Sequence, residues 1–140
     1  MLILSFSGAI KQNMCGLYCC QQSNKHWMAI TQLCATDARR LFPCWDHPAF
    51  KARFALTLQV PSHYQVALVS SPHVLWLYYE AHRVDLQTIS NMPIADESRD
   101  SEKEWKTVRF ATSPPMSTYL LCFVIGEFEC LEDSVEGIQV

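Results

Sequence analysis

The sequence lacks the features that mark membrane and nucleic-acid-binding proteins. No apolar run reaches the roughly 18 to 20 residues that a membrane-spanning helix needs. The closest run, residues 66–79, is interrupted by Pro72 and His73. The 11 Lys and Arg residues form no cluster and the formal net charge is −3, which argues against a nucleic acid as partner. We therefore expect no membrane span and no nucleic-acid partner.

The seven cysteines include no Cys-x-x-Cys pair, whereas a closed zinc site needs four ligands at suitable spacing. Their odd number also differs from the even count that disulfide frameworks of secreted domains usually have. Residues 1–8 contain no basic residue, and their apolar run is too short for a signal peptide. These absences predict reduced cysteines, no metal site and a cytoplasmic location.

With 140 residues, 49% of them apolar, the chain is long enough for one domain with a core. Residues 50–60 alternate between apolar and polar side chains, which is typical of a strand with one solvent-facing side. Residues 2–6 and 105–111 also read as strands. Residues 119–125 are continuously apolar, so we expect a strand that is buried on both faces.

One short helical turn is predicted over residues 36–42, capped by Thr36 or Asp37 and ended before Pro43. The remaining pattern of short strands and polar turns favours an all-β fold. We expect a partial antiparallel β-sandwich or saddle. Asp46, with Arg39 and Arg40, is expected to form a buried charge network that holds the turn after Pro43.

Three segments carry a more specific signal, and they occur in a fixed order. They are residues 31–51, which begin Thr31-Gln-Leu-Cys, then Ser90-Asn-Met-Pro-Ile94, and residues 114–129, which begin Pro114-Pro-Met-Ser-Thr-Tyr. Together they resemble the N-terminal β domain of the zinc metalloaminopeptidases, of the aminopeptidase N and puromycin-sensitive type. The resemblance implies one incomplete domain over residues 1–140, without the strands that precede this region in the family. Such a saddle packs over a catalytic domain and closes the substrate side of its active site.

The resemblance also assigns candidate substrate-binding residues. The family has Thr-Gln-x-Glu, or Gln in the Glu place, and that side chain helps bind the free α-amine of the substrate. This chain keeps Gln32, which in the family lies near the pocket for the first side chain, but it has Cys34 in the Glu place. A thiol is mostly neutral at pH 7 and is a poor acceptor, so we expect amine binding to be lost. We do not interpret Cys34 as a nucleophile, because no motif places a general base beside it.

Two catalytic motifs of the family are missing from this chain. None of the five histidines is followed by Glu and no two are four positions apart, so the paired imidazoles that hold zinc on one helix face are absent. The Gly-x-Met-Glu-Asn motif is absent as well. The resemblance therefore implies a zinc ion (Zn2+) in the parent family but none in this chain. We expect a fragment of a zinc metalloaminopeptidase with no catalytic residues, which meets a peptide substrate only together with a catalytic domain.

Residues 69–89 are an insertion relative to the family, which runs from Val-Ala-Leu directly into Ser-Asn-Met-Pro. The insertion is rich in large apolar side chains, whereas surface loops are normally polar. It is either an extra packed element or unselected sequence such as a translated intron, and we favour the second.

Two alternatives to the enzyme-fragment hypothesis stay open. One is a non-catalytic interaction module whose unpaired sheet edges pair with a full-length aminopeptidase or with a second copy. The other is an unselected product of a degenerate or mis-spliced gene. The sequence does not rank them.

Overall fold

The computed structural model describes residues 1–23, 25–61, 87–100, 105–127, 134–135 and 138–139. Within these ranges the chain consists of strands, loops and two short 3-10 turns, and every pair of neighbouring strands is antiparallel. The all-β, antiparallel prediction is therefore confirmed. None of the helices in the described ranges combines the length and apolar character needed to cross a membrane.

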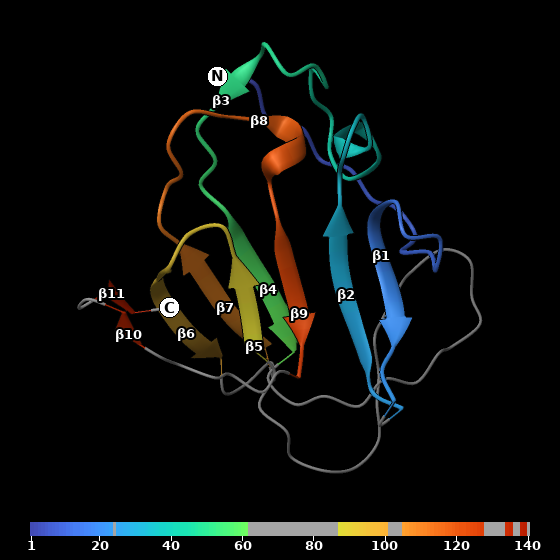
Figure 1. The fold of residues 1–140 in the computed structure, drawn as a ribbon, viewed down its shortest axis with the longest axis vertical. Helices are drawn as coiled ribbons and strands as arrows, with labels where there is room; N and C mark the ends of the chain where they lie inside the picture. The colour runs from blue at the N-terminus through green and yellow to red at the C-terminus, as the bar shows by residue number, and fades with distance from the viewer. Residues whose placement is uncertain (24, 62–86, 101–104, 128–133, 136–137, 140) are drawn as a thin grey trace.

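Two sheets make up most of the described structure (Figure 1). The first sheet has the order β1-β2-β9-β5 and consists of β1 (Gly16–Gln21), β2 (Trp27–Gln32), β9 (Phe123–Gly126) and β5 (Gln87–Ser90). The second has the order β4-β7-β6 and consists of β4 (Thr57–Pro61), β7 (Trp105–Phe110) and β6 (Ile94–Asp100). Two small ladders pair β3 (Lys51–Ala52) with β8 (Met116–Ser117), and β10 (Ser134–Val135) with β11 (Ile138–Gln139).

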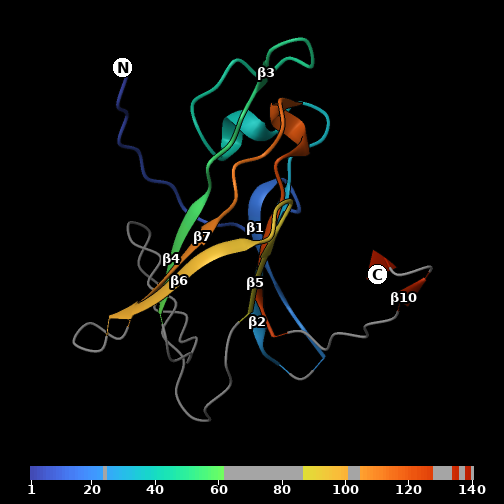
Figure 2. The same cartoon turned by 90° about the vertical axis from the view of Figure 1, so that its left-hand side faces the viewer.

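Period-two alternation decides which side chains of each sheet are buried. In β2 and just beyond it Ala29, Thr31 and Leu33 are buried, and in β7 Val108 and Phe110 are buried. Figure 2 shows the two sheets side by side, with the β10–β11 hairpin apart from both. The alternation gives each sheet one buried face, as expected for sheets that share a core.

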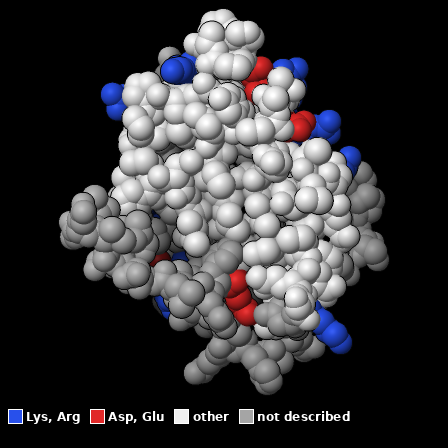
Figure 3. All heavy atoms as spheres, in the orientation of Figure 1, with Lys and Arg blue, Asp and Glu red and all other residues white. Residues whose placement is uncertain are grey.

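The outward face of the first sheet is apolar. Register places four side chains in one row across its strands, namely Tyr18, Ile30, Val124 and Ile89. Figure 3 views this face, and its middle shows almost no charged side chains below a charged upper rim. The row is only partly covered, because Ile89 is 46% exposed.

The predicted strand over residues 50–60 is divided in two. Its alternation is confirmed from Phe54 onward, where apolar side chains are the more buried ones, but only β3 and β4 have strand geometry. Between them the backbone N–H of Phe54 donates to Ser113 Oγ at 3.0 Å, and the Ser113 N–H donates to the Phe54 carbonyl at 3.0 Å. The nearly inaccessible Ser113 therefore interrupts the ladder with a side-chain contact.

Two other predicted strands are wrong in part. Residues 2–6 are exposed loop, because none of the described backbone hydrogen bonds reaches them. Residues 119–125 contain the end of η2 (Thr118–Leu120) and, after two residues without strand geometry, all of β9 except its last residue. Here the Asn91 amide bonds the Leu120 carbonyl and the Cys122 N–H, which are backbone groups that a longer strand would use in its ladder.

The predicted helical turn is shorter than expected. It is the single 3-10 turn η1 (Ala38–Arg40). Asp37 stands at its N-cap but makes no capping bond, because its carboxylate instead accepts a bond from Arg40 Nε at 2.5 Å. Of the proposed insertion, residues 69–86 lie outside the described residues. Residues 87–89 are not irregular but belong to β5, where Thr88 is 6% exposed.

Candidate functional site

The first and third of the segments singled out in the sequence meet at one end of the structure, and the second is bonded to the third through Asn91. We call this end the convergent end; it comprises residues 32–34, η1, the loop of residues 41–50, β3, β8 and η2, and it lies at the top of Figure 1. The first and third segments are joined by bonds from Ser117 Oγ to the Pro48 carbonyl (2.7 Å) and from Thr118 Oγ1 to Asp46 Oδ1 (3.2 Å). A small core of Leu33, Ala38 and Leu121 lies beneath.

Asp46 is the central anchor of this end. Its side chain is only 2% exposed, although it lies in a loop. Oδ2 accepts bonds from the backbone N–H and from Nε of Arg39, both at 3.1 Å, while Oδ1 accepts the Thr118 hydroxyl. The Arg39 guanidinium also reaches the Asp46 carbonyl at 3.2 Å. The predicted buried charge network is therefore confirmed only in part: Arg39 pairs with Asp46, but the Arg39 side chain is 59% exposed, and Arg40 pairs with Asp37 instead.

These contacts shift the titration of Asp46. Burial alone raises the pKa of the carboxyl group, but the hydrogen bonds from Arg39 and Thr118 outweigh burial and leave the pKa below its ordinary value. Burial raises the pKa of the nearby Cys44 thiol, with the charge of Asp46 as a second cause. Asp46 is therefore ionised and Cys44 neutral at pH 7, which suits a structural role for both.

Gln32 and Cys34 lie where β2 leaves the first sheet. The buried side chains of Thr31 and Leu33 alternate with the exposed Gln32 and Cys34, so the two candidate residues lie on the exposed side of the chain. Gln32 Oε1 accepts a long bond of 3.4 Å from the Cys34 N–H. The exposed thiol has no bonded imidazole or carboxylate among the described residues. The described residues thus provide an exposed polar surface here and no paired nucleophile and base.

The neighbouring strand adds more exposed groups to this surface. The Thr31 hydroxyl both donates to the Phe123 carbonyl (3.2 Å) and accepts from the Phe123 N–H (3.0 Å). Continuing that antiparallel pairing by one residue sets Gln32 opposite Cys122, which is also exposed. Asn91 fixes the backbone on both sides of Leu121 with bonds of 2.9 and 2.6 Å. The sequence does not predict this role of Asn91, since it shows only that the residue belongs to the short block of residues 90–94.

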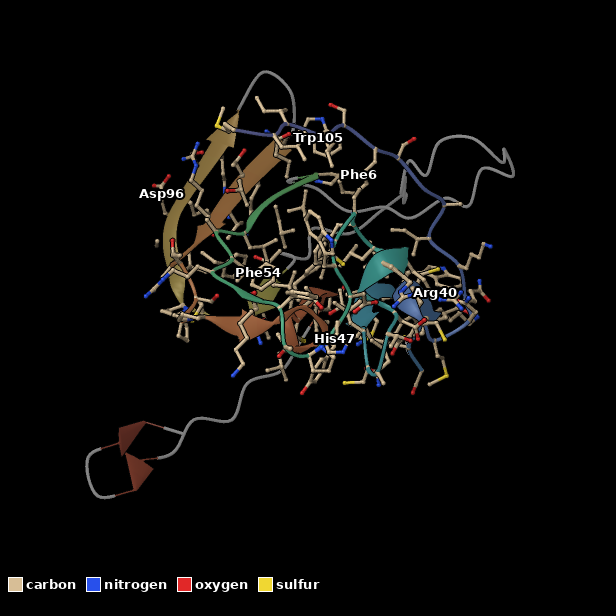
Figure 4. The ribbon with its side chains drawn as sticks, turned by 90° about the horizontal axis from the view of Figure 1, so that it is seen from above. Phe6, Arg40, His47, Phe54, Asp96 and Trp105 are labelled. Carbon is tan, nitrogen blue, oxygen red and sulfur yellow. The ribbon has the colours of Figure 1, made fainter. Side chains whose placement is uncertain are left out.

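Gly16 determines how closely η1 approaches β1. Its φ is +69°, which is a left-handed conformation, and an added Cβ would lie 2.9 Å from Arg40 Cβ. A residue with a side chain would therefore meet both backbone strain and a steric contact. Figure 4 labels Arg40 and His47 at this end, and Asp96 lies at the far edge of the second sheet. The tight packing of η1 helps to place the Gln32–Cys34 surface.

The donor set of the described residues does not fit a metal ion. No group of three His, Cys, Asp or Glu side chains within the described ranges could hold one. A zinc site needs at least three protein ligands. The described residues therefore provide no zinc centre.

The structure defines the class of protein as an all-β domain. Its exposed surface is formed by three separate segments of the chain. The sequence matches the Peptidase M1 N-terminal domain family over residues 1–74 and 80–120, and the chain therefore belongs to that family. It is 40% identical to Aminopeptidase M1-B of Oryza sativa subsp. japonica over its whole length. It is 34% identical to Aminopeptidase N of Bos taurus over 91% of its length, and 35% identical to the Puromycin-sensitive aminopeptidase of Caenorhabditis elegans over 99%.

The chain spans only a small part of these relatives. It covers 14% of the rice protein, 12% of the bovine protein and 13% of the nematode protein. The resemblance to the N-terminal part of aminopeptidases is thus confirmed. Most of each relative lies outside the matched region, so the activity and the substrate of this chain can only be proposed.

Proposed function

We propose that the chain is the substrate-side domain of a zinc metalloaminopeptidase that removes N-terminal residues from peptides in the cytoplasm. On its own it is not catalytic, and it meets a peptide only together with a catalytic domain that holds the zinc ion. The observation that supports this role most strongly is the exposure of Gln32 and Cys34 at the convergent end. The fold fixes their position but leaves their side chains open to a partner domain.

Cys34 then reduces recognition of the peptide's free amine. A carboxylate at this position would give an ammonium ion a charge-assisted bond of about 1.5–3 kcal/mol. A neutral thiol gives almost none of that stabilisation. About 1.4 kcal/mol corresponds to tenfold in binding, so the carboxylate is worth roughly 10- to 150-fold. Gln32 would influence preference for the first side chain.

The test is a chimera in which this chain is joined in register to the catalytic domain of a relative. Cys34→Glu should raise kcat/KM on an alanyl or leucyl substrate by roughly 10- to 150-fold, and the gain should disappear on an N-acetylated peptide. Cys34→Ser is the matched control, since it is exposed and small but neutral, and it should bring no gain. Gln32→Ala should change the order of preferred substrates. An unchanged kcat/KM in Cys34→Glu would contradict the assigned role.

The isolated chain offers a second test. With added zinc it should release no aminoacyl chromophore, because the described residues supply neither zinc ligands nor a general base beside Cys34. Chelator-sensitive turnover that follows the protein through purification would refute this.

A second candidate, an interaction module, draws on the apolar side chains of the same end. Trp45 and Phe50 are 77% and 59% exposed in the loop of residues 41–50, and Leu120 of η2 is 46% exposed. The partner that suits this role is a full-length aminopeptidase or its catalytic domain. Trp45→Asp should weaken binding of the chain to a separately produced catalytic domain in calorimetry. Unaltered affinity in that variant would exclude this surface.

A further inference from the structure

The two edges of the second sheet are protected differently. β6 carries Asp96, Glu97 and Arg99, and its carboxylates pair with Arg109 and Lys106 of β7. β4, at the other edge, consists of Thr57, Leu58, Gln59, Val60 and Pro61 and holds no charged residue. Charges on an edge strand deter pairing with another chain. Pro61 cannot donate to a ladder and limits pairing at the end of β4. A further strand can therefore add along residues 57–60, the charge-free edge of the described sheet.

The chain also contains a strand-like segment that has no backbone partner among the described residues. Residues 2–6 read Leu-Ile-Leu-Ser-Phe, a composition that favours strands. Their four apolar side chains are exposed by 77%, 75%, 54% and 60% for Leu2, Ile3, Leu4 and Phe6. No described backbone hydrogen bond reaches residues 1–10, and Figure 2 shows this part of the chain outside both sheets. The body of the molecule thus leaves both the backbone and the side chains of this segment uncovered.

We propose that two copies of the chain exchange this segment, so that residues 2–6 of each copy pair along β4 of the other. Within the described residues each copy has one edge strand without a second neighbour and one segment without a backbone partner, and a two-fold arrangement satisfies both at once. Ser7 and Gly8 form the hinge, where a Cβ added to Gly8 would meet no atom within 4 Å.

The area that such an exchange buries is sufficient for a specific dimer. Burial of an apolar side chain of this size removes about 60–120 Å² from water. Met1 and the four apolar residues of the segment, counted in both copies and together with the surface that they cover, therefore bury roughly 1,200–2,400 Å². A standard interface buries about 1,600 Å². The exchange does not involve Gln32 or Cys34, so the result of its test is independent of the test of the proposed function.

The experiment measures the mass of the purified chain by sedimentation at roughly 1 to 100 μM, a range that reaches the weak end of the affinities found for interfaces of this area. We expect a concentration-dependent doubling of mass. Leu4→Lys on the segment and Gln59→Lys on the edge should each weaken dimerisation at least tenfold, because each charge enters the interface twice. Ile89→Lys is the matched control; it alters an equally exposed apolar side chain on the outward face of the first sheet and should leave the dimer unchanged.

Mixing the two weakened variants distinguishes exchange from other contacts. Leu4→Lys retains an intact β4, and Gln59→Lys retains an intact segment, so a mixture should form heterodimers with one undamaged pairing. A chain that stays monomeric throughout the range would overturn the proposal. So would a dimer that survives Leu4→Lys but is lost in Ile89→Lys, which would place the interface on the apolar sheet face.

Discussion

Two arginine–aspartate pairs, one at the convergent end and one at the β6 edge, show how differently the same chemistry acts in one molecule. Arg109 and Asp96 meet at 2.6 Å, and both side chains are 55% exposed. Arg39 and Asp46 are farther apart, at 3.1 Å, but the carboxylate is only 2% exposed. By distance alone the surface pair is the stronger one.

The surroundings of each carboxylate reverse that order. Asp96 faces water, which screens its attraction to Arg109 and solvates the charge as well as the partner does. Asp46 has lost its water and accepts bonds from Arg39 and from the Thr118 hydroxyl. Removing Asp46 leaves the buried Thr118 hydroxyl without this acceptor, whereas water can reach the exposed Arg39 side chain. The burial of a carboxylate and the number of its donors, not the shortest distance, therefore decide its contribution to stability.

The largest effect is expected from Asp46→Ala, which removes the anchor of the convergent end. Bonds to a charged group contribute about 1.5–3 kcal/mol, so the free energy of unfolding should fall by about 2–3 kcal/mol. Urea unfolding followed by tryptophan fluorescence measures this loss. A loss no greater than that of Asp96→Ala would show that burial does not separate the two pairs.

Acid should weaken the contribution of the Asp46 charge. Because the pKa of Asp46 is lowered in the folded chain, its stabilisation is present above the ordinary pKa of about 3.9. That stabilisation is lost as the pH falls through the lower, folded value. Unfolding of the unaltered chain and of Asp46→Asn should therefore differ most near neutral pH and converge in acid. A stability difference that is independent of pH would contradict an ionised Asp46.

A somewhat smaller loss is expected from Gly16→Ala, which tests the close packing of η1 on β1. The positive φ and the contact with Arg40 Cβ should cost about 1–2 kcal/mol. Gly8→Ala is the matched control; its added methyl group meets open space and should leave the unfolding midpoint nearly unchanged. Equal midpoints in both variants would mean that η1 does not lie against β1 as described.

Asn91→Ala should come next, with a loss of about 1 kcal/mol. The variant removes the bonds to the Leu120 carbonyl and the Cys122 N–H, which water replaces in part because the site is exposed. Hydrogen exchange at the Cys122 amide gives a local readout and should accelerate. Unchanged protection of that amide would show that its bond to Asn91 is not formed in solution.

The smallest effect is expected from Asp96→Ala. A pair with both side chains exposed contributes about 0–1 kcal/mol, and the difference from the unaltered chain should disappear in 1 M salt, where the Debye length is about 3 Å. Unfolding at low and high salt measures it. A loss of several kcal/mol that persists in salt would place Asp96 among the structural anchors.

The fold class follows from the sequence because strand periodicity is a local property. Alternation over Phe54 to Val60 and the apolar pair of Val108 and Phe110 were visible in the order of residues, and the structure confirms their burial pattern. Strand ends were not predictable in the same way. Ser113 divides one predicted strand from 59 positions away, and Asn91 truncates another from about 30 positions away. No local pattern reports such distant side-chain contacts.

The position of the candidate site was predictable from the sequence, but the contacts that hold it in place were not. The resemblance identified Gln32 and Cys34, and the structure places both on an exposed surface; their substrate-binding role stays a prediction. The sequence predicted a network of Asp46 with both Arg39 and Arg40, but neighbouring side chains on a 3-10 turn point in different directions. Only the folded structure shows that Arg39 pairs with Asp46 in the loop, whereas Arg40 pairs with Asp37.

The most direct test of the central claim, that the convergent end is preformed in this chain, is the titration of Asp46 itself. Carbon-13 NMR of the side-chain carboxyl groups in the isolated chain would follow that residue, with Asp46→Asn used to assign its signal. We predict a pKa below the ordinary aspartate value of about 3.9, because the bonds from Arg39 and Thr118 exist only in the folded loop. A pKa at or above the ordinary value would show that Asp46 is not held by these bonds, and it would contradict a preformed convergent end.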